Sequence, residues 1–112
     1  MRHVMVRYRV SPETAVENED LIRAVYTELQ ATEPAGLRYA TFRLDDGVTF
    51  VHVAQTPDEL NPLERIGAFK EFQAGLKDRC VEPPAVSELT LVGSFGIGTR
   101  SESRVASDGA SS

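Results

Sequence analysis

A single histidine within a strand pattern is the first candidate for chemistry. His52 lies in the apolar, β-prone segment 50–53, and an imidazole can exchange a proton near neutral pH. His52 is therefore the predicted catalytic base, although a lone strand histidine also suits a structural or interface role. The other histidine, His3, is expected near solvent.

Four further polar side chains are candidates for contacting a ligand. Asn18 is the one polar residue on the apolar stripe of a predicted helix, so its amide could orient a ligand; exposure near the helix start is the alternative. Tyrosine hydroxyls can supply the few polar groups that an apolar cavity needs. The predicted substrate-binding residues are Tyr8, Tyr26, Tyr39 and Asn18.

Residue counts and spacing argue against several other kinds of site. The chain of 112 residues has one cysteine, which allows no internal disulfide and no multi-thiolate metal site. No histidine is paired with a carboxylate at metal-ligand spacing, and we predict neither a metal nor another cofactor. Gly93, Gly96 and Gly98 do not form a G-x-G-x-x-G motif at a helix start, so no nucleotide site is implied.

Charge and hydropathy are typical of a globular protein in the cytoplasm. The net charge of −5 and the lack of a basic patch argue against nucleic-acid binding. No apolar run approaches the roughly 18 residues of a membrane span, and the first residues show no signal-peptide pattern. We expect a cytoplasmic protein that contacts neither nucleic acid nor membrane.

The first third of the chain predicts a strand followed by a helix. Residues 2–10 alternate, and their apolar face consists of Val4, Val6, Tyr8 and Val10. Ser11-Pro12 combines a capping residue with a proline at the first helical position, so a helix is expected from there to about Thr32. Its apolar stripe consists of Ala15, Ile22, Val25, Tyr26 and Leu29.

The centre of the chain predicts a β-hairpin with its turn at residues 45–47. A two-residue turn would pair Phe42 with Val51, whereas a three-residue loop would pair Phe42 with Phe50. A shift of one residue moves a side chain across the sheet, so the register decides which face His52 occupies. The first register is favoured because it gathers on one face the apolar side chains of Ala40, Phe42, Leu44, Val51 and Val53.

The last part predicts a second helix and a fourth strand. The helix is expected from Pro62 and to end at Glu82-Pro83-Pro84, with a stripe formed by Ile66, Phe69, Phe72, Leu76 and Cys80. A strand over residues 86–95 follows. Residues 96–112 are rich in Gly, Ser and charge and are expected to be disordered, so the predicted domain covers residues 1–95.

The order β-α-β-β-α-β indicates an α+β, ferredoxin-like fold. Right-handed crossovers give a four-stranded antiparallel sheet, in the order 4-1-3-2, with both helices on one face. We expect side chains such as Phe50, Tyr39 or Met5 on the open face. Because an exposed apolar sheet marks an interface, a second copy is predicted to cover it, which makes the protein a homodimer.

The chain resembles the dimeric α+β barrel superfamily, in particular its antibiotic biosynthesis monooxygenase-like branch. The similarity lies in the element order, the segment 34–39 (Pro-Ala-Gly-Leu-Arg-Tyr), the strand 50–53 (Phe-Val-His-Val) and the helical segment 68–72 (Ala-Phe-Lys-Glu-Phe). Active members of that branch oxidise aromatic polyketides with dioxygen, without metal or flavin. The resemblance therefore implies a base that removes a proton from an acidic substrate in an apolar cavity.

Two functions remain open from the sequence. The first is a small-molecule-binding dimeric barrel that acts as a cofactor-independent monooxygenase on an aromatic or polyketide-like substrate. The second is a non-catalytic dimeric barrel that sequesters an apolar ligand or binds another protein. An enclosed cavity with a distinct polar group would favour the first, and a cavity filled by Phe69, Phe72 and Tyr26 would favour the second.

Overall fold

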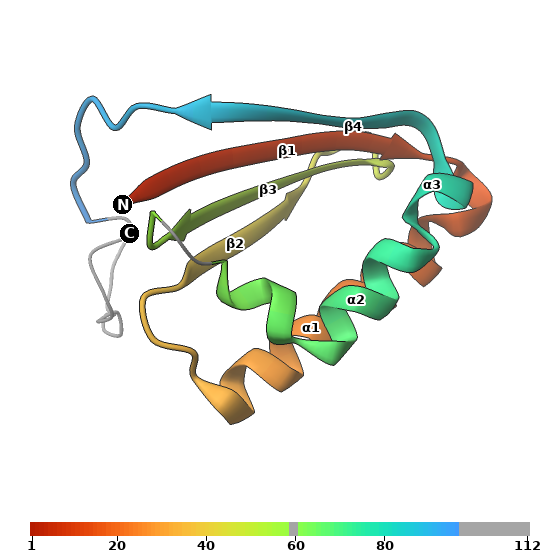
Figure 1. The fold of residues 1–112 in the computed structure, drawn as a ribbon. Helices are drawn as coiled ribbons and strands as arrows, with labels where there is room; N and C mark the ends of the chain where they lie inside the picture. Colours follow the sequence, from red (N-terminus) through yellow and green to blue (C-terminus); the bar gives the residue numbers. More distant parts are fainter. Residues whose placement is uncertain (59–60, 97–112) are drawn as a thin grey trace.

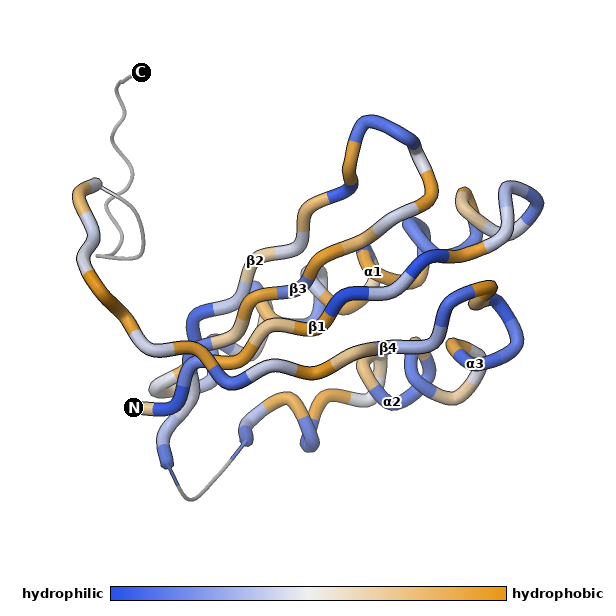
Figure 2. The backbone as a smooth tube through the Cα atoms, turned by 90° about the horizontal axis from the view of Figure 1, so that it is seen from above, coloured by the Kyte–Doolittle hydropathy of each residue, from blue (hydrophilic) through white to orange (hydrophobic). Residues whose placement is uncertain are grey.

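Four antiparallel strands form one sheet in this computed structural model, which describes residues 1–58 and 61–96. The strands are β1 (Arg2–Val10), β2 (Arg38–Arg43), β3 (Thr49–Thr56) and β4 (Cys80–Leu89). They lie side by side in the order β2-β3-β1-β4 (Figures 1 and 2). This is the predicted order, and it confirms the ferredoxin-like α+β fold. Beyond Gly96, the predicted disordered tail lies outside the described residues.

The helical segments cover one face of this sheet (Figure 1). They are the 3₁₀ turn η1 (Pro12–Thr14), α1 (Ala15–Thr32), the 3₁₀ turn η2 (Pro62–Arg65), α2 (Gly67–Ala74) and α3 (Leu76–Arg79). The prediction that both helical regions share a face is therefore confirmed. Within the described ranges, no helix combines the length and the apolarity that a membrane crossing requires.

The second helical region corrects two predicted boundaries. It is not one helix, because extended backbone at Ile66 separates η2 from α2, and Gly75 separates α2 from α3. The fourth strand begins at Cys80 and ends at Leu89, so Pro83-Pro84 lies within it instead of preceding it. A strand accepts these prolines because β4 is an edge strand that pairs only with β1.

The hairpin has the favoured register but a longer loop than a two-residue turn. Phe42 pairs with Val51, as predicted. The Leu44 N–H donates to the Thr49 carbonyl, while the Asp46 carboxylate accepts from the Val48 and Thr49 N–H groups and the Thr49 hydroxyl. These bonds lower the pKa of Asp46 to about 2. The carboxylate organises the loop together with a turn in which the Gly47 N–H donates to the Leu44 carbonyl.

The register places the aromatic and polar side chains of β2 and β3 under the helices. Phe50 is only 1% exposed, and Tyr39 packs against the same core, so the prediction that these two line the open face is wrong. Met5 does pair with Val53, on the aliphatic side of the sheet. The buried core on the helix side consists of Tyr8, Val10, Ile22, Val25, Phe50, Phe72 and Leu76.

Candidate functional site

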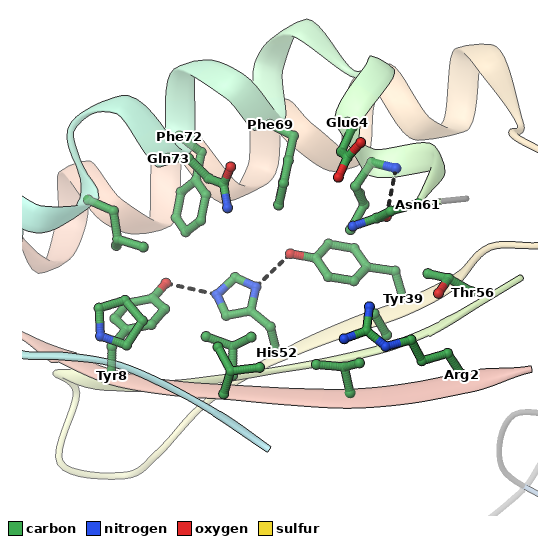
Figure 3. A pocket seen from close by; sticks show the side chains of 17 residues that line it. Arg2, Tyr8, Tyr39, His52, Thr56, Asn61, Glu64, Phe69, Phe72 and Gln73 are labelled. Atoms are coloured by element: carbon green, nitrogen blue, oxygen red, sulfur yellow. Dashed lines mark hydrogen bonds between the residues drawn. The ribbon is translucent and has the colours of Figure 1, made fainter. Parts of the chain in front are cut away.

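A cavity of about 330 Å³ lies between the helix-facing side of the sheet and the η2–α2 region. Phe69 and Phe72 enter it from α2, and His52 approaches from β3 on the opposite side (Figure 3). Besides the histidine and the two tyrosines, the polar side chains that line the cavity are Arg2, Thr56, Asn61, Glu64 and Gln73. The cavity thus combines apolar walls with a small number of polar groups, as ligand sites do.

His52 stands between two phenols in this cavity. Its Nε2 lies 2.8 Å from the Tyr8 hydroxyl and its Nδ1 lies 2.6 Å from the Tyr39 hydroxyl (Figure 3). The imidazole is 5% exposed, and its ring packs 5.4 Å from that of Phe72. Burial penalises the charged form and lowers the pKa of His52 to about 4. The imidazole is therefore neutral at pH 7, and one of its two nitrogens carries a lone pair that can accept a proton through the tyrosine bonded to it.

A buried arginine orients the groups behind Tyr8. The Arg79 Nε donates to Asn18 Oδ1 over 2.9 Å, and Asn18 Nδ2 donates to the Tyr8 hydroxyl over 3.0 Å. Since a guanidinium only donates, the amide oxygen of Asn18 must face Arg79 and its NH₂ must face Tyr8. The Tyr8 oxygen is consequently an acceptor from Asn18, and its own proton remains free to point elsewhere.

Two proton arrangements satisfy the chain of bonds around His52. In one, Tyr8 donates to Nε2, and the Nδ1–H donates to Tyr39, which leaves the Tyr39 proton for the cavity. In the other, Tyr39 donates to Nδ1, and the Nε2–H donates to Tyr8, which leaves the Tyr8 proton for the cavity. Burial raises the pKa of both phenols, so each keeps its proton at neutral pH. Either arrangement offers a ligand one phenolic O–H group.

The network branches at His52 Nδ1, which contacts a threonine as well as Tyr39. Thr41 Oγ1 lies 3.2 Å from His52 Nδ1 and 2.8 Å from the Tyr26 hydroxyl. The structure therefore joins all five predicted site residues in one network, but only His52, Tyr8 and Tyr39 line the cavity. Asn18 and Tyr26 act on it through neighbours. Their roles in catalysis or binding stay predictions.

Arg79 is a member of this network that sequence reasoning missed. It is 4% exposed and forms no ion pair with the carboxylates of residues 1–58 and 61–96. Its Nη2 donates to the Phe72 carbonyl, and its guanidinium lies 5.3 Å from the Phe72 ring centroid. The available signal was spacing, because Phe72, Leu76 and Arg79 follow the i, i+4, i+7 rule of a buried helix face.

Gly75 provides the space for this guanidinium, and this supports a stability prediction. A Cβ at residue 75 would lie 2.8 Å from Arg79 Nη1, whereas a Cβ at Gly67 would meet only Glu28 Oε1, at 3.8 Å. Although alanine favours helix by up to about 1 kcal/mol, Gly75→Ala should lower the free energy of unfolding by about 1–2 kcal/mol, because the charged hydrogen bonds of Arg79 are weakened. Gly67→Ala is the control and should be neutral or stabilising. Urea unfolding of both variants measures this, and equal stabilisation by the two would contradict the proposed packing.

The described residues offer little for a metal ion. No three His, Cys, Asp or Glu side chains gather within residues 1–58 and 61–96 in a way that could hold one. The groups in the hydrogen-bond network around His52 are phenols, a hydroxyl, an amide and the imidazole itself. This set suits the binding of an organic molecule and the movement of protons.

Solved structures share this arrangement of strands and helices. One titled an antibiotic biosynthesis monooxygenase has a TM-score of 0.66 and 20% identity, covering 83% of this chain and 100% of that chain. Rv0793 from Mycobacterium tuberculosis has a TM-score of 0.67 and 20% identity, covering 83% and 96%. SnoaB, a cofactor-independent oxygenase from Streptomyces nogalater, has a TM-score of 0.61 and 16% identity, covering 85% and 96%.

The chain therefore has the fold of the antibiotic biosynthesis monooxygenase-like structures. The resemblance predicted from the sequence is confirmed at the level of fold. No protein-family model matches the chain, and no curated protein matches its sequence. The chemistry must accordingly be argued from the site itself.

Proposed function

We propose that this protein binds an aromatic or polyketide-like phenol or enol in the cavity and oxidises it with dioxygen, without a cofactor. The observation that carries the proposal is the neutral, buried imidazole of His52 between two phenols in an apolar cavity. A neutral imidazole can accept a proton, and a positioned base contributes roughly 10²- to 10⁴-fold to proton abstraction. Deprotonation makes such a substrate electron-rich enough to react with dioxygen.

The reaction balances without another reductant. The substrate hydroxyl gives its proton to the Tyr39 oxygen while the Tyr39 proton moves to His52 Nδ1, which leaves an enolate facing an imidazolium. The enolate carbon and dioxygen then form a peroxide anion, which takes a proton back from the imidazolium through Tyr39 to give a hydroperoxide. The hydroperoxide loses water to give a carbonyl. One methylene and one dioxygen molecule thus become one carbonyl and one water. The aromatic walls formed by Phe69 and Phe72 exclude water from the anion during this sequence.

Arg79 supports the same proposal through its charge. The guanidinium is buried and has no carboxylate partner among the described residues. A fixed positive charge in a low-dielectric environment stabilises negative charge that develops nearby, with no reorganisation during the reaction. Asn18 and Tyr8 link this charge to the cavity. We infer that the site favours the conjugate base of its ligand over the neutral acid.

A non-catalytic binding protein is the second candidate function. It is supported by the two ring nitrogens of His52, because both already bond to side chains of the protein. A ligand could then occupy the cavity without exchanging a proton. Against this candidate, Phe69 and Phe72 line the cavity without filling it, and Tyr26 lies outside it.

Dioxygen consumption with an anthrone separates the two candidates. Anthrone is an aromatic ketone whose enol is acidic, and its oxidation product is the corresponding quinone. Catalysis predicts faster oxygen uptake with protein than with buffer, with one quinone formed per dioxygen consumed. Binding without catalysis predicts that anthrone quenches or shifts tyrosine signals while oxygen uptake stays at the buffer rate.

We further propose that two copies associate in the cytoplasm through the open face of the sheet. Phe42 is 57% exposed on this face and pairs with Val51, and Met5 pairs with Val53 on the same face. A hollow of about 600 Å³ on this face is lined by Phe42 and Val53 on the sheet and by Leu91 and Phe95, which follow β4. Contiguous apolar surface of this kind marks an interface, and a two-fold axis would bring the same patch together with itself.

Charge at the centre of this face should separate the subunits. Val53→Glu would bring two like charges together across a two-fold axis, which costs several kcal/mol, so the dimer dissociation constant should rise by about 10²-fold or more. Val16→Glu is the matched control, since Val16 is 72% exposed on α1 and far from the open face. Sedimentation equilibrium measures both variants. A wild-type protein that is monomeric at micromolar concentration would contradict the dimer itself.

A further inference from the structure

One branch of the hydrogen-bond network leads from His52 to the outside of the protein. His52 Nδ1 lies 3.2 Å from Thr41 Oγ1, which lies 2.8 Å from the Tyr26 hydroxyl. Thr41 and Tyr26 are both half-buried and line an open cleft of about 240 Å³ between α1 and β2. This cleft is separate from the cavity, because Thr41 and Tyr26 are not among the residues that line the cavity.

The outer cleft carries charged side chains. Glu19 and Arg43 form an ion pair across it, with 3.0 Å between Oε1 and Nη1. Glu19 accepts from Arg23 as well. The Tyr26 hydroxyl therefore lies between a buried imidazole on one side and a polar, solvent-accessible surface on the other.

The other two branches end at different places. The Tyr8 branch ends at Asn18 Nδ2 and Arg79, which act as donors toward their neighbours and have no free lone pair for an arriving proton. The Tyr39 branch ends at the cavity, where the substrate would lie (Figure 3). Thr41 and Tyr26 form a continuous pair of hydroxyls, each of which can donate and accept, and the pair ends at a cleft outside the cavity.

We propose that Thr41 and Tyr26 form a proton path that connects His52 with solvent at the α1–β2 cleft. In one passage, the Nδ1–H proton moves to Thr41 Oγ1 while the Thr41 proton moves to the Tyr26 oxygen. The Tyr26 proton moves at the same time to a water molecule in the cleft. Each hydroxyl gains one proton and loses one, so both stay neutral and only His52 and the water change charge.

The path adds a step to the proposed function, and its role in turnover depends on that function. The proton that His52 takes from the substrate can leave along the path while the enolate persists, and a proton can return along it for the peroxide anion. The path runs from Nδ1 through Thr41 and Tyr26, so this exchange does not pass through the occupied cavity. Thr41 and Tyr26 are then positioning residues, because they act through His52 and do not touch the substrate.

Solvent exchange of the His52 ring proton tests the path without any substrate. The protein is labelled with ¹⁵N-histidine, and the exchange of the ring N–H with water is measured by NMR; His3→Gln assigns the two histidines. Thr41→Val keeps the shape of the side chain but removes the oxygen that relays the proton, so the exchange of the ring N–H should slow by at least about tenfold. This factor is smaller than the rate enhancement that a positioned proton-transfer group usually gives. Tyr26→Phe should slow it similarly, and Thr41→Ser should exchange like wild type.

Backbone amide exchange of Val51 and Val53 in the same samples reports opening of β3. Slower ring exchange with unchanged amide exchange would support the path, since a purely structural hydrogen bond would not produce this pattern. Ring exchange that stays the same or becomes faster in both Thr41→Val and Tyr26→Phe would overturn it. Oxygen uptake is measured separately, so a failed path and a failed oxygenase are distinguishable.

Discussion

The His52→Gln protein should consume dioxygen about 10²- to 10⁴-fold more slowly than wild type with anthrone, because it lacks a group that accepts the substrate proton at pH 7. Glutamine has a comparable reach and can keep a hydrogen bond to Tyr8 or Tyr39, so the cavity should remain intact. The loss should appear in kcat with little change in KM, since the imidazole acts on the proton and not on binding.

His3→Gln is the matched control for this experiment. His3 lies on the open face of the sheet, opposite Leu89, and borders the hollow there instead of the cavity. It should therefore keep the wild-type rate. A His52→Gln protein as active as wild type would exclude His52 as the base, and uptake equal to that in buffer for all three proteins would exclude the oxygenase.

Acid should destabilise the wild-type protein through His52. The pKa of this residue is about 4 in the folded protein and about 6.5 in the unfolded chain. Between these values the unfolded state binds more protons, so stability is highest above pH 6.5 and falls as the pH decreases toward 4. The loss over this range should be up to about 3 kcal/mol.

Urea unfolding of wild type and His52→Gln at pH 7, 5 and 4 isolates this contribution. The variant lacks the imidazole and should therefore lose less stability than wild type between pH 7 and pH 4, so the difference between the two proteins should shrink as the pH decreases. The lowered pKa of Asp46, about 2, costs both proteins stability as the pH falls toward and below the usual aspartate value, so this contribution cancels in the difference between them. Parallel curves for the two proteins would show that His52 is not buried in its neutral form.

Local patterns were sufficient to predict the β1–α1 unit and the hairpin. The alternation of β1 and the Ser11-Pro12 signal define their elements without reference to the rest of the chain. The fourth strand was harder to predict, because Pro83-Pro84 normally ends regular structure and only the position of β4 at an edge makes it acceptable. The position of β4 at the edge depends on how all four strands are ordered, and a short stretch of sequence does not reveal that order.

The site was partly predictable for a similar reason. Residue type identified His52 and Asn18, and the hairpin register determined that His52 faces Tyr8. Thr41 was not identified because a threonine on a strand is ordinary, and its role depends on two partners, at sequence separations of 11 and 15 residues. Arg79 was not identified because a charged residue at a helix end is usually solvated.

All three tyrosines of the chain belong to the hydrogen-bond network around His52, and the chain contains no tryptophan. Nearly all of its near-ultraviolet absorption and emission therefore originates in or beside the site. Occupancy of the cavity, or a shift of the phenolic protons, can thus be followed optically in the unlabelled protein, without competing chromophores elsewhere in the molecule.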